Sequence, residues 1–315
     1  MIETITVLGA GTMGYGISLN FALAGYAVNL FDVRPEALNN ALLNARKALS
    51  VMIEEGLHTK EEGEKALAGI RPFTDRPAAC AQADLLMEAM PENLRLKQDT
   101  FVELDALCGP DCIFASNTSS LKLTDICAPL SQSRKSRALI THYFNPAHLI
   151  PLVELLPHPD TPPTVLEEIE AMYKRAGKVS IRVLKDINGM IGNRIQAAIG
   201  REAFWLIENG YCSGKDLGRA LAFGPCFRYA TTDYLEIVDL GGVDIWSVVH
   251  DLLYKDINSS TEVSGLLKNK AASGEHGWKT GKGFYSYEGQ AKAEVMERFL
   301  RNLARQLKVS KNYMF

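Results

Sequence analysis

The sequence lacks the features by which several classes of protein are recognised. Positive charge is not in excess: 34 Lys and Arg residues face 37 Asp and Glu residues, and the net charge of −3 gives no basic surface for nucleic acid or an anionic membrane. No apolar run reaches the roughly 18 residues that a membrane-spanning helix needs. No internal repeat or low-complexity stretch is present. We therefore expect an ordinary globular protein that binds neither nucleic acid nor membrane.

Paired cysteines are missing as well. None of the six cysteines forms a C-x-x-C pair or has the spacing to histidine of a zinc site, so we expect no bound metal. The first strand pattern begins almost at Met1, so we expect no signal peptide. Both features predict free thiols in a reducing, cytoplasmic compartment. The cysteines are Cys80, Cys108, Cys112, Cys127, Cys212 and Cys226.

The first part of the chain does have the alternating pattern of an α/β fold. With 315 residues, 47% of them hydrophobic and 23% charged, the chain is long enough for two domains. Short apolar runs alternate with helical patterns, which is typical of βαβ units in a parallel sheet. The runs span residues 4–10, 27–32, 84–90, 112–117, 137–144, 152–157 and 179–184.

After Lys185 the strand patterns stop and helical patterns take over. The stretch NGMIGNRIQAAIGREAFWLIENGY places apolar residues on one face of a long amphipathic helix, and further helical patterns follow it. We therefore predict an α/β domain over residues 1–184 and an all-helical domain over residues 185–315. The apolar face of the long helix carries Ile191, Ile195, Ile199, Ala203 and Leu206.

Residues 36–70 interrupt the α/β alternation. Two helical patterns lie here between strand patterns, and Leu38, Leu42, Leu49 and Ile53 predict an amphipathic hairpin. An insertion of this size beside a cofactor site could cover a substrate or could pad the sheet. The pattern favours neither interpretation.

A glycine-rich loop follows the first strand pattern and opens a helix. In VLGAGTMGYG, Gly9, Gly11 and Gly14 match the G-x-G-x-x-G pattern of dinucleotide-binding folds. The glycines allow, in order, a tight turn, the approach of backbone to a diphosphate, and close packing of the helix. The first helical residues, Thr12 and Met13, would offer their N–H groups to the phosphates. A tight turn without a ligand is the alternative.

Asp32 ends the second strand pattern eighteen residues after Gly14, where an acid is expected to bind the ribose 2′-hydroxyl. A carboxylate there would repel the 2′-phosphate of NADP, so we predict NAD as the cofactor. Arg34, two positions later, is a feature that would instead favour NADP, because its positive charge could bind the 2′-phosphate. Loop and acid together predict a Rossmann-like, NAD-binding domain.

A histidine and a glutamate stand out in HYFNPAHLIPLVELLP, residues 142–157. Glu154 lies in an apolar strand pattern, where a buried carboxylate is unfavourable unless a charged or hydrogen-bonding group meets it. His142, twelve positions earlier, is the nearest candidate. Such a pair is either catalytic or a structural hydrogen bond that closes a strand.

Four motifs give the sequence a family resemblance. With MPENLRLK, FASNTSSL, HYFNP…PLVEL and GWKTGKGFYSY in this order, the chain resembles the 3-hydroxyacyl-CoA dehydrogenase family from the first strand to about Tyr287. The resemblance implies that His142 is the general base and that Glu154 holds it. Imidazole is a suitable acceptor for a hydroxyl proton near neutral pH, and a carboxylate on its other nitrogen fixes the tautomer.

The resemblance assigns further roles, each with a plainer alternative. It implies that Ser119 contacts substrate and cofactor and that Asn193 binds the substrate oxygen. Otherwise Ser119 belongs to a turn or helix cap, and Asn193 is a solvated helix residue. The cofactor contacts that it implies are Glu92, Lys97, Asn145 and Lys279, of which the first two could instead be a solvated charge pair and the last part of an exposed turn.

Three departures from the family pattern concern the substrate. Acyl-CoA members carry a serine and a lysine on the hairpin that contact CoA, and an ungapped alignment from Asp32 places Ala48 and Glu55 there. The family's Gly-Pro-aromatic-Glu stretch is here TDYLE, which keeps Glu236. Nearby Arg228 would suit a carboxylate of the substrate, or could be a surface or interface arginine.

These departures leave two substrate classes open. We favour NAD-dependent oxidation of an L-3-hydroxyacyl-CoA, or the reverse reduction, as in fatty acid metabolism. The alternative is a small free 3-hydroxy acid, as in the gulonate and carnitine dehydrogenase branch, with Arg228 on the carboxylate. A non-catalytic NADH-binding protein on the same scaffold is a third possibility.

The helical domain is also the expected dimer surface. Its long helix with Phe204, Trp205 and Trp246 offers more apolar face than a domain of this size buries alone, so we predict a homodimer. The active site is expected between the two domains, at the carboxyl ends of the strands.

Overall fold

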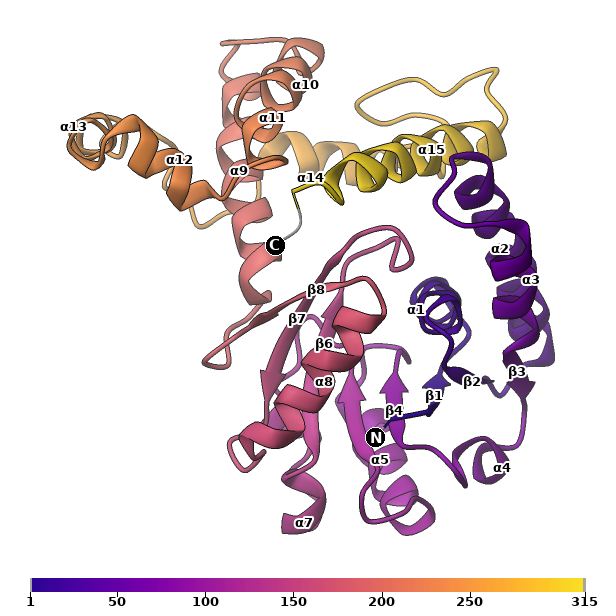
Figure 1. Cartoon of the computed structure of the whole chain (residues 1–315). Helices are drawn as coiled ribbons and strands as arrows, with labels where there is room; N and C mark the ends of the chain where they lie inside the picture. The colour runs from indigo at the N-terminus through magenta and orange to yellow at the C-terminus, as the bar shows by residue number, and fades with distance from the viewer. Residues whose placement is uncertain (1, 314–315) are drawn as a thin grey trace. The chain divides into compact units, whose positions relative to one another are not determined.

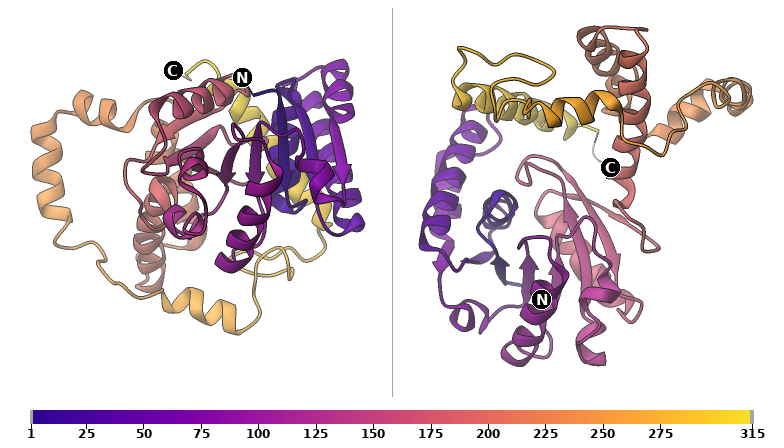
Figure 2. Two further views of the ribbon diagram at one scale, coloured as in Figure 1. Left: turned by 90° about the horizontal axis from the view of Figure 1, so that it is seen from below. Right: turned by 180° about the vertical axis from the view of Figure 1, so that it is seen from behind.

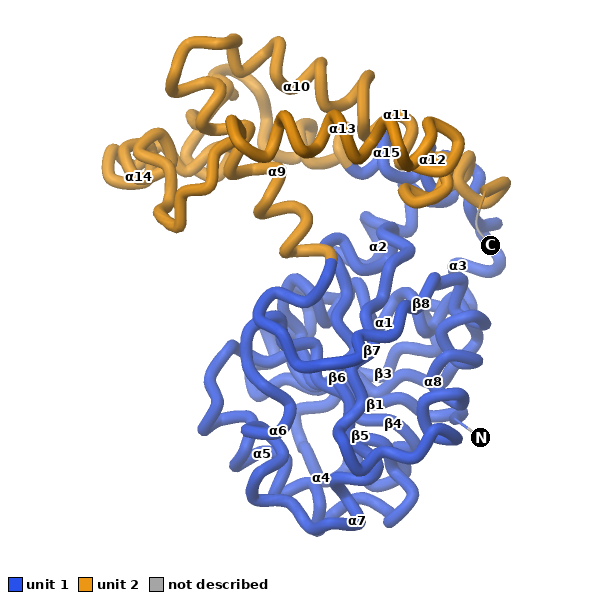
Figure 3. Tube along the Cα trace, turned by 90° about the vertical axis from the view of Figure 1, so that its left-hand side faces the viewer, with its two compact units in different colours: residues 1–191, 300–307 blue, residues 192–299, 308–315 orange. Residues whose placement is uncertain are grey.

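The computed structural model describes residues 2–313 and divides the chain into two compact units, coloured separately in Figure 3. Unit 1 spans Met1–Ile191 and takes in Leu300–Leu307, and unit 2 spans Gly192–Phe299 and Lys308–Phe315. The sequence predicted a division at residue 184. The observed boundary lies inside a helix instead, and a short segment near the C-terminus joins unit 1.

Unit 1 is built on one sheet of eight strands in the order β3-β2-β1-β4-β5-β6-β7-β8 (Figure 1). The chain moves outward from β1 to β3 and then returns to start β4 on the other side of β1. This reversal is the dinucleotide-binding arrangement of the Rossmann fold, so the predicted fold class is confirmed. The strands are β1 (Thr4–Leu8), β2 (Ala27–Phe31), β3 (Ile70–Phe73), β4 (Leu85–Glu88), β5 (Ile113–Ser116), β6 (Ala138–Tyr143), β7 (Leu152–Pro157) and β8 (Val179–Arg182).

The sheet differs from the sequence-based expectation in two respects. β6 and β7 are antiparallel, not parallel, because residues 144–151 are too few for the crossover that parallel neighbours require. β3 was not predicted because it has no apolar run. Its two middle residues are Arg71 and Pro72, and both are exposed. Its place at the edge of the sheet explains why a proline is tolerated there.

Alternate residues of the strands enter two separate cores, one on each face of the sheet. On one face, Leu85, Met87 and Leu139 pack with α1 (Thr12–Leu23) and α8 (Pro163–Arg175). On the other, Leu86 and Ile140 pack with the remaining crossover helices. Those helices are α4 (Arg76–Cys80), α5 (Leu94–Leu107) and α6 (Leu123–Ile126), and the short α7 (Gln132–Lys135) precedes β6.

The predicted hairpin forms two helices, α2 (Pro35–Glu54) and α3 (Lys60–Ala68), that pack against α1 (Figures 1 and 2). Thr59 begins α3 in a capping box: its side chain accepts from the Glu62 N–H, and the Glu62 carboxylate accepts from the Thr59 N–H. A third core joins α1 and α2 to the last helix of the chain.

The named elements of unit 2 are helices, as predicted, and the turn that follows α14 adds isolated β-bridges of Lys282 with Gly277 and Ser286. Its hydrophobic side chains are unevenly covered: Ala203 and Ile237 are buried, whereas Phe223 and Leu240 are 78% and 79% exposed. In the described part of the chain, no helix is long and apolar enough to cross a membrane. Two of its helices lie partly in unit 1, since unit 1 includes the first two residues of α9 and residues 300–307 of α15. The helices are α9 (Met190–Glu208), α10 (Gly214–Phe223), α11 (Pro225–Tyr229), α12 (Tyr234–Gly241), α13 (Val243–Leu253), α14 (Gly265–Ala272) and α15 (Lys292–Ser310).

Candidate active site

The loop between β1 and α1 has the geometry of a diphosphate-binding turn. Gly9 has a φ of +104°, and a Cβ there would lie 2.7 Å from the Ala89 carbonyl oxygen. A Cβ on Gly14 would lie 1.8 Å from the Gly9 carbonyl oxygen, so only glycine lets α1 start this close to the strand. A Cβ on Gly11 would meet no atom within 4 Å. Packing therefore explains Gly9 and Gly14, whereas Gly11 leaves open space in which a ligand can reach the backbone.

The start of α1 is prepared for an anion. No side chain caps the helix at Gly11, and its first turn holds no acidic residue. Thr12 is exposed and Met13 half-buried, so the first N–H groups lie at the surface of unit 1. A helix N-terminus of this kind carries partial positive charge and donates to phosphate. These residues fit the diphosphate of NAD.

Asp32, directly after β2, links the loop to the second strand. Its carboxylate accepts from the Ala10 N–H and from the Arg34 N–H, both at 3.0 Å. The Arg34 guanidinium is largely exposed and lies 3.7 Å from the same carboxylate. Each Asp32 oxygen accepts one hydrogen bond and keeps a lone pair to which a ribose hydroxyl could donate.

His142 and Glu154 face each other across β6 and β7. In the antiparallel register His142 is directly opposite Glu154, and cross-strand partners of this kind project from the same face of a sheet. His142 Nδ1 lies 2.7 Å from Glu154 Oε2. The antiparallel pairing of β6 and β7 thus brings two residues that are twelve positions apart in the sequence within hydrogen-bonding distance.

Glu154 is fully buried but well compensated. Besides His142, the Ile191 N–H at the start of α9 donates to Glu154 Oε1 at 2.8 Å. The helix N-terminus and the imidazole together stabilise a carboxylate that burial would otherwise disfavour. The sequence reasoning did not foresee this contact with the helix.

The other ring nitrogen of His142 is the one suited to chemistry. Across residues 2–313, Nε2 has no hydrogen-bond partner, and the residue keeps 6% of its surface exposed. The Phe144 ring lies 5.2 Å from the imidazole, between ring centroids, and adds an apolar wall. A histidine that is held at Nδ1 and free at Nε2 can accept a proton from a bound hydroxyl.

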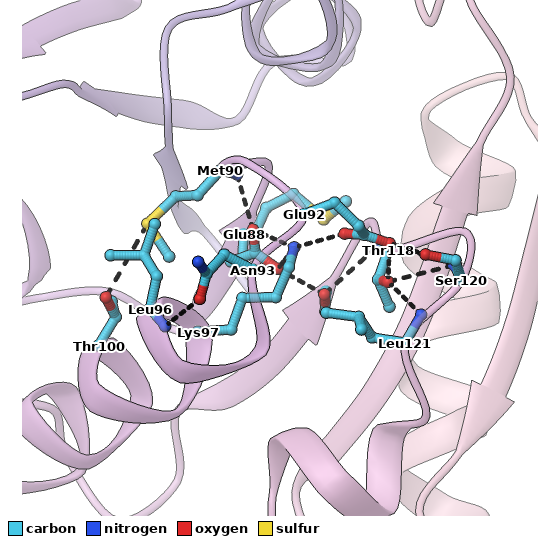
Figure 4. Close-up of polar contacts among 12 residues, drawn as sticks. Glu88, Met90, Glu92, Asn93, Leu96, Lys97, Thr100, Thr118, Ser120 and Leu121 are labelled. Carbon is cyan, nitrogen blue, oxygen red and sulfur yellow. Dashed lines mark hydrogen bonds and ion pairs between the residues drawn. The ribbon is translucent and has the colours of Figure 1, made fainter.

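Glu92 ties two loops together beside the ends of β4 and β5 (Figure 4). It accepts from the Thr118 hydroxyl and from both the N–H and the hydroxyl of Ser120, the last two at 3.1 and 2.8 Å. Burial would raise the pKa of Glu92, but these hydrogen bonds and the nearby Lys97 ammonium lower it to about 2. Ser119 is exposed between the two bonded residues, so Glu92 fixes the loop that presents it.

Lys97 is buried within the same network (Figure 4). Its ammonium lies 2.7 Å from both oxygens of Glu88 and 3.2 Å from Glu92 Oε2, which accounts for all three of its donors. Glu88 also accepts from the Ser116 hydroxyl and from the Met90 N–H. The sequence reasoning missed Glu88, although an acid that ends the apolar run DLLMEAM is the same signal that drew attention to Glu154.

Asn145 is exposed in the loop between β6 and β7. The buried ammonium of Lys178 fastens this loop by donating to the carbonyls of Ala147 and Ile150, at 2.5 and 2.8 Å. Burial lowers the pKa of Lys178 to about 7. Lys178 is a further positioning residue that no pattern in the sequence indicated.

The remaining predicted residues belong to unit 2. Asn193 is half-buried in the first turns of α9, and Lys279 is exposed, with its carbonyl bonded to the Lys292 ammonium. Arg228 is exposed on α11. The rings of Tyr229 and Tyr234 meet edge to face at 5.2 Å, which brings α11 next to the start of α12, where Glu236 lies.

Two family models match the chain. The 3-hydroxyacyl-CoA dehydrogenase NAD-binding domain matches residues 4–187, and the C-terminal domain of the same family matches residues 189–287. The NAD-binding domain agrees with the glycine loop and Asp32, so NAD is the cofactor.

Individual relatives differ in the substrates that their names give. The 5-formyl-3-hydroxy-2-methylpyridine 4-carboxylate 5-dehydrogenase of Mesorhizobium japonicum is 31% identical over 300 residues, 95% of either chain. A crystal structure of a dehydrogenase of that name covers 99% of both chains with a TM-score of 0.88 and 29% identity. The (S)-3-hydroxybutyryl-CoA dehydrogenase of Ralstonia eutropha covers 91% of this chain and 100% of its own, with a TM-score of 0.73 and 30% identity. Across both of its domains, this chain belongs to the 3-hydroxyacyl-CoA dehydrogenase family of NAD-dependent oxidoreductases.

Proposed function

We propose that this protein oxidises the hydroxyl group of an L-3-hydroxyacyl substrate, as its CoA thioester or as the free acid, with NAD, or reduces the corresponding 3-oxo group with NADH, and that His142 is its general base. The observation that carries the proposal is the buried His142–Glu154 pair, in which Nδ1 is held at 2.7 Å and Nε2 has no partner in residues 2–313. A structural pair is the alternative, and the NAD-binding domain to which the pair belongs favours catalysis. Here one nitrogen is left for a substrate.

The residues of the chain supply the acid–base part of the reaction. NAD, when bound, accepts the hydride from the carbon that bears the hydroxyl. His142 Nε2 takes the hydroxyl proton, and the Glu154 carboxylate stabilises the imidazolium that forms. The Ile191 N–H holds Glu154 in place, so the ring does not rotate as its charge changes. In the reverse direction, the imidazolium returns the proton to the 3-oxo oxygen.

The other site residues keep the roles that the family resemblance implies. Ser119 contacts substrate and cofactor, Asn193 binds the substrate oxygen, and Asn145 lies near the nicotinamide. Lys279 is a cofactor contact. For Glu92 and Lys97 the hydrogen bonds support an indirect role, since both are engaged with other protein groups and hold the Ser119 loop.

Two substrate classes are candidates, and they differ in whether the acyl group is bound to CoA or is a free acid. The sequence favours an L-3-hydroxyacyl-CoA, which would place the protein in fatty acid metabolism. A small free hydroxy acid, with Arg228 on its carboxylate, is supported by the relative whose name gives a pyridine carboxylate as substrate. Glu55, which Arg301 and Arg305 of α15 contact, also supports the free acid.

A cytoplasmic homodimer remains part of the proposal. Unit 2 exposes large apolar side chains on α12 and α13, among them Leu240, Val248 and Leu252, each at least 70% exposed. Surfaces of this kind are usually covered by a partner. Light scattering on the purified chain tests this point, and a monomeric mass at micromolar concentration would contradict it.

The test of function is NADH oxidation by the purified protein with acetoacetyl-CoA and, separately, with the free 3-oxo acids acetoacetate and dehydrocarnitine. We expect turnover of at least one of these substrates and its loss in His142→Gln. NADH binding without turnover of any of them would favour a non-catalytic NADH-binding protein. Equal turnover by wild type and His142→Gln would remove the proposed base.

A further inference from the structure

The last helix of the chain packs on the helical hairpin of unit 1. In ERFLRNLARQL the apolar residues Leu300, Leu303, Ala304 and Leu307 recur at helical spacing and contact the core formed by α1 and α2. Ala304 is completely buried. Residues 300–307 are counted in unit 1 for this reason, and Figure 3 gives them its colour.

Ion pairs fasten this helix to the end of α2. Arg305 makes a bidentate contact with Glu55, from Nε to Oε2 at 2.8 Å and from Nη2 to Oε1 at 3.0 Å. Arg301 donates to Glu55 Oε1 at 3.3 Å and to Glu54. Two arginines one helical turn apart thus meet two adjacent glutamates, an arrangement that fixes register as well as charge. The hydrogen bond from Arg305 lowers the pKa of Glu55 although partial burial opposes it, so Glu55 is ionised.

This helix lies outside the part of the chain that the family models match, since the second model ends at residue 287 and α15 starts at Lys292. The solved 3-hydroxybutyryl-CoA dehydrogenase aligns over its whole length yet covers 91% of this chain. The pyridine carboxylate dehydrogenase structure covers 99% of both chains. The segment also accompanies a relative named for CoA substrates, because the Archaeoglobus fulgidus 3-hydroxyacyl-CoA dehydrogenase structure covers 98% of this chain and 99% of its own. The contacts that the helix makes in this chain, and not its presence, therefore bear on the substrate.

The docked helix changes what the hairpin can bind. Ala48 and Glu55, the two positions that the family resemblance assigns to CoA contacts, are both under α15: Ala48 is 2% exposed in the shared core, and Glu55 is paired with both arginines. CoA carries a diphosphate and a 3′-phosphate and needs unpaired cations. Here the two α15 cations that face the hairpin, Arg301 and Arg305, are already paired with the carboxylates of Glu54 and Glu55.

We propose that α15 is a built-in cover of the α2–α3 hairpin that excludes CoA thioesters and restricts the substrate to a small free hydroxy acid. This inference rests on the proposed dehydrogenase function and specifies its substrate class. The cover acts by occupying the hairpin surface, and the paired charges at Glu54 and Glu55 hold it there.

The test compares three forms of the full chain. Arg301→Glu/Arg305→Glu places like charges opposite Glu54 and Glu55 and is designed to release the helix. Arg298→Glu makes the same type of change on an exposed residue of the same helix, whose side chain bonds Gln290 instead. Hydrogen exchange at residues 300–307 reports docking, and kcat/KM values with acetoacetate, dehydrocarnitine and acetoacetyl-CoA report substrate preference.

We expect the wild type and Arg298→Glu to prefer a free acid by at least about tenfold and to bind no acetyl-CoA at millimolar concentration in calorimetry. In the double variant, the helix should lose protection and the preference should shrink. A wild type that prefers acetoacetyl-CoA or binds acetyl-CoA would overturn the inference, as would a released helix with an unchanged preference. Should the double variant not fold, Glu54→Ala/Glu55→Ala replaces it, because this variant removes the two carboxylates that the arginines contact without adding like charge.

Failure of the proposed function gives a different result. In that case no substrate is turned over although NADH binds, and acetyl-CoA titration alone decides the inference. Binding to the released variant but not to the wild type supports the cover. Binding to the wild type, or to neither form, contradicts it.

Discussion

In the described part of unit 1, two pairs of a basic and an acidic side chain are buried, Lys97 with Glu88 and His142 with Glu154, and they are completed in opposite ways. Lys97 and Glu88 are saturated, because all three donors of the ammonium are used and the carboxylate accepts from Ser116 and Met90 as well. His142 and Glu154 are not, because within residues 2–313 the imidazole Nε2 has no partner. Glu88 ends β4 and Lys97 lies in α5, whereas His142 and Glu154 lie in β6 and β7.

The difference separates a structural pair from a reactive one. A buried charge network is stable when every donor and acceptor is satisfied, and a saturated group has no bond left for a ligand. A general base must keep one nitrogen free. The buried His148 also has ring nitrogens without a partner, but burial and Lys178 lower its pKa to about 4. A free Nε2 combined with a carboxylate at Nδ1 therefore marks His142 as the catalytic candidate.

Replacing His142 should have the largest effect. His142→Gln keeps a hydrogen bond toward Glu154 but removes the base, so we expect kcat to fall by about a thousandfold, or roughly 4 kcal/mol in the barrier. NADH affinity should be unchanged, because the imidazole is not part of the glycine loop. Stopped-flow kinetics and NADH fluorescence measure the two quantities. A kcat within a few-fold of the wild type would place His142 with the structural pairs.

Replacing Lys97 should act on stability instead. Lys97→Met leaves Glu88 buried without a counter-charge, and we expect the free energy of unfolding to fall by about 3–4 kcal/mol, measured by urea denaturation. Lys97→Met combined with Glu88→Leu removes both charges and should recover much of the loss. Weaker NADH binding with normal stability would instead make Lys97 a direct cofactor contact.

The comparison also shows how far sequence reasoning reaches. The glycine loop, Asp32 and the His142–Glu154 pair were predictable because each is a local pattern with a fixed spacing. The antiparallel turn between β6 and β7 was not, since apolar runs carry no direction. The pairing of Arg301 with Glu55 joins residues 246 positions apart, and no spacing rule connects them. The position of Glu88 at the end of an apolar run could be recognised in the sequence. Its role could not, because that role depends on its ion pair with Lys97, nine residues later.

Neutralising Glu154 should have a smaller effect than removing the base. Glu154→Gln keeps the ring and leaves an acceptor for the Ile191 N–H, but it no longer stabilises the imidazolium. We expect kcat to fall by about a hundredfold, or roughly 2.7 kcal/mol, with KM for the 3-oxo acid nearly constant. Steady-state kinetics separate the two parameters. A loss confined to KM would mean that Glu154 shapes the binding site and does not support the base.

Replacing Glu92 should have the smallest effect. This exposed residue contacts the buried Lys97–Glu88 pair only through the Lys97 ammonium, at 3.2 Å. Its pKa of about 2 lies below the ordinary 4.5, so its contribution to stability is complete above pH 4.5 and is lost as the pH falls toward about 2. Glu92→Gln should therefore flatten the decline in unfolding free energy between about pH 5 and about pH 2. The exposed Glu64→Gln is the matched control and should leave that decline unchanged.

The same Glu92 variant should loosen the Ser119 loop without removing a group that touches substrate, so KM should rise more than kcat falls. If the acid decline is unaltered and kcat alone drops, Glu92 is a direct participant, and the division between a saturated structural pair and a free reactive one does not extend to this residue.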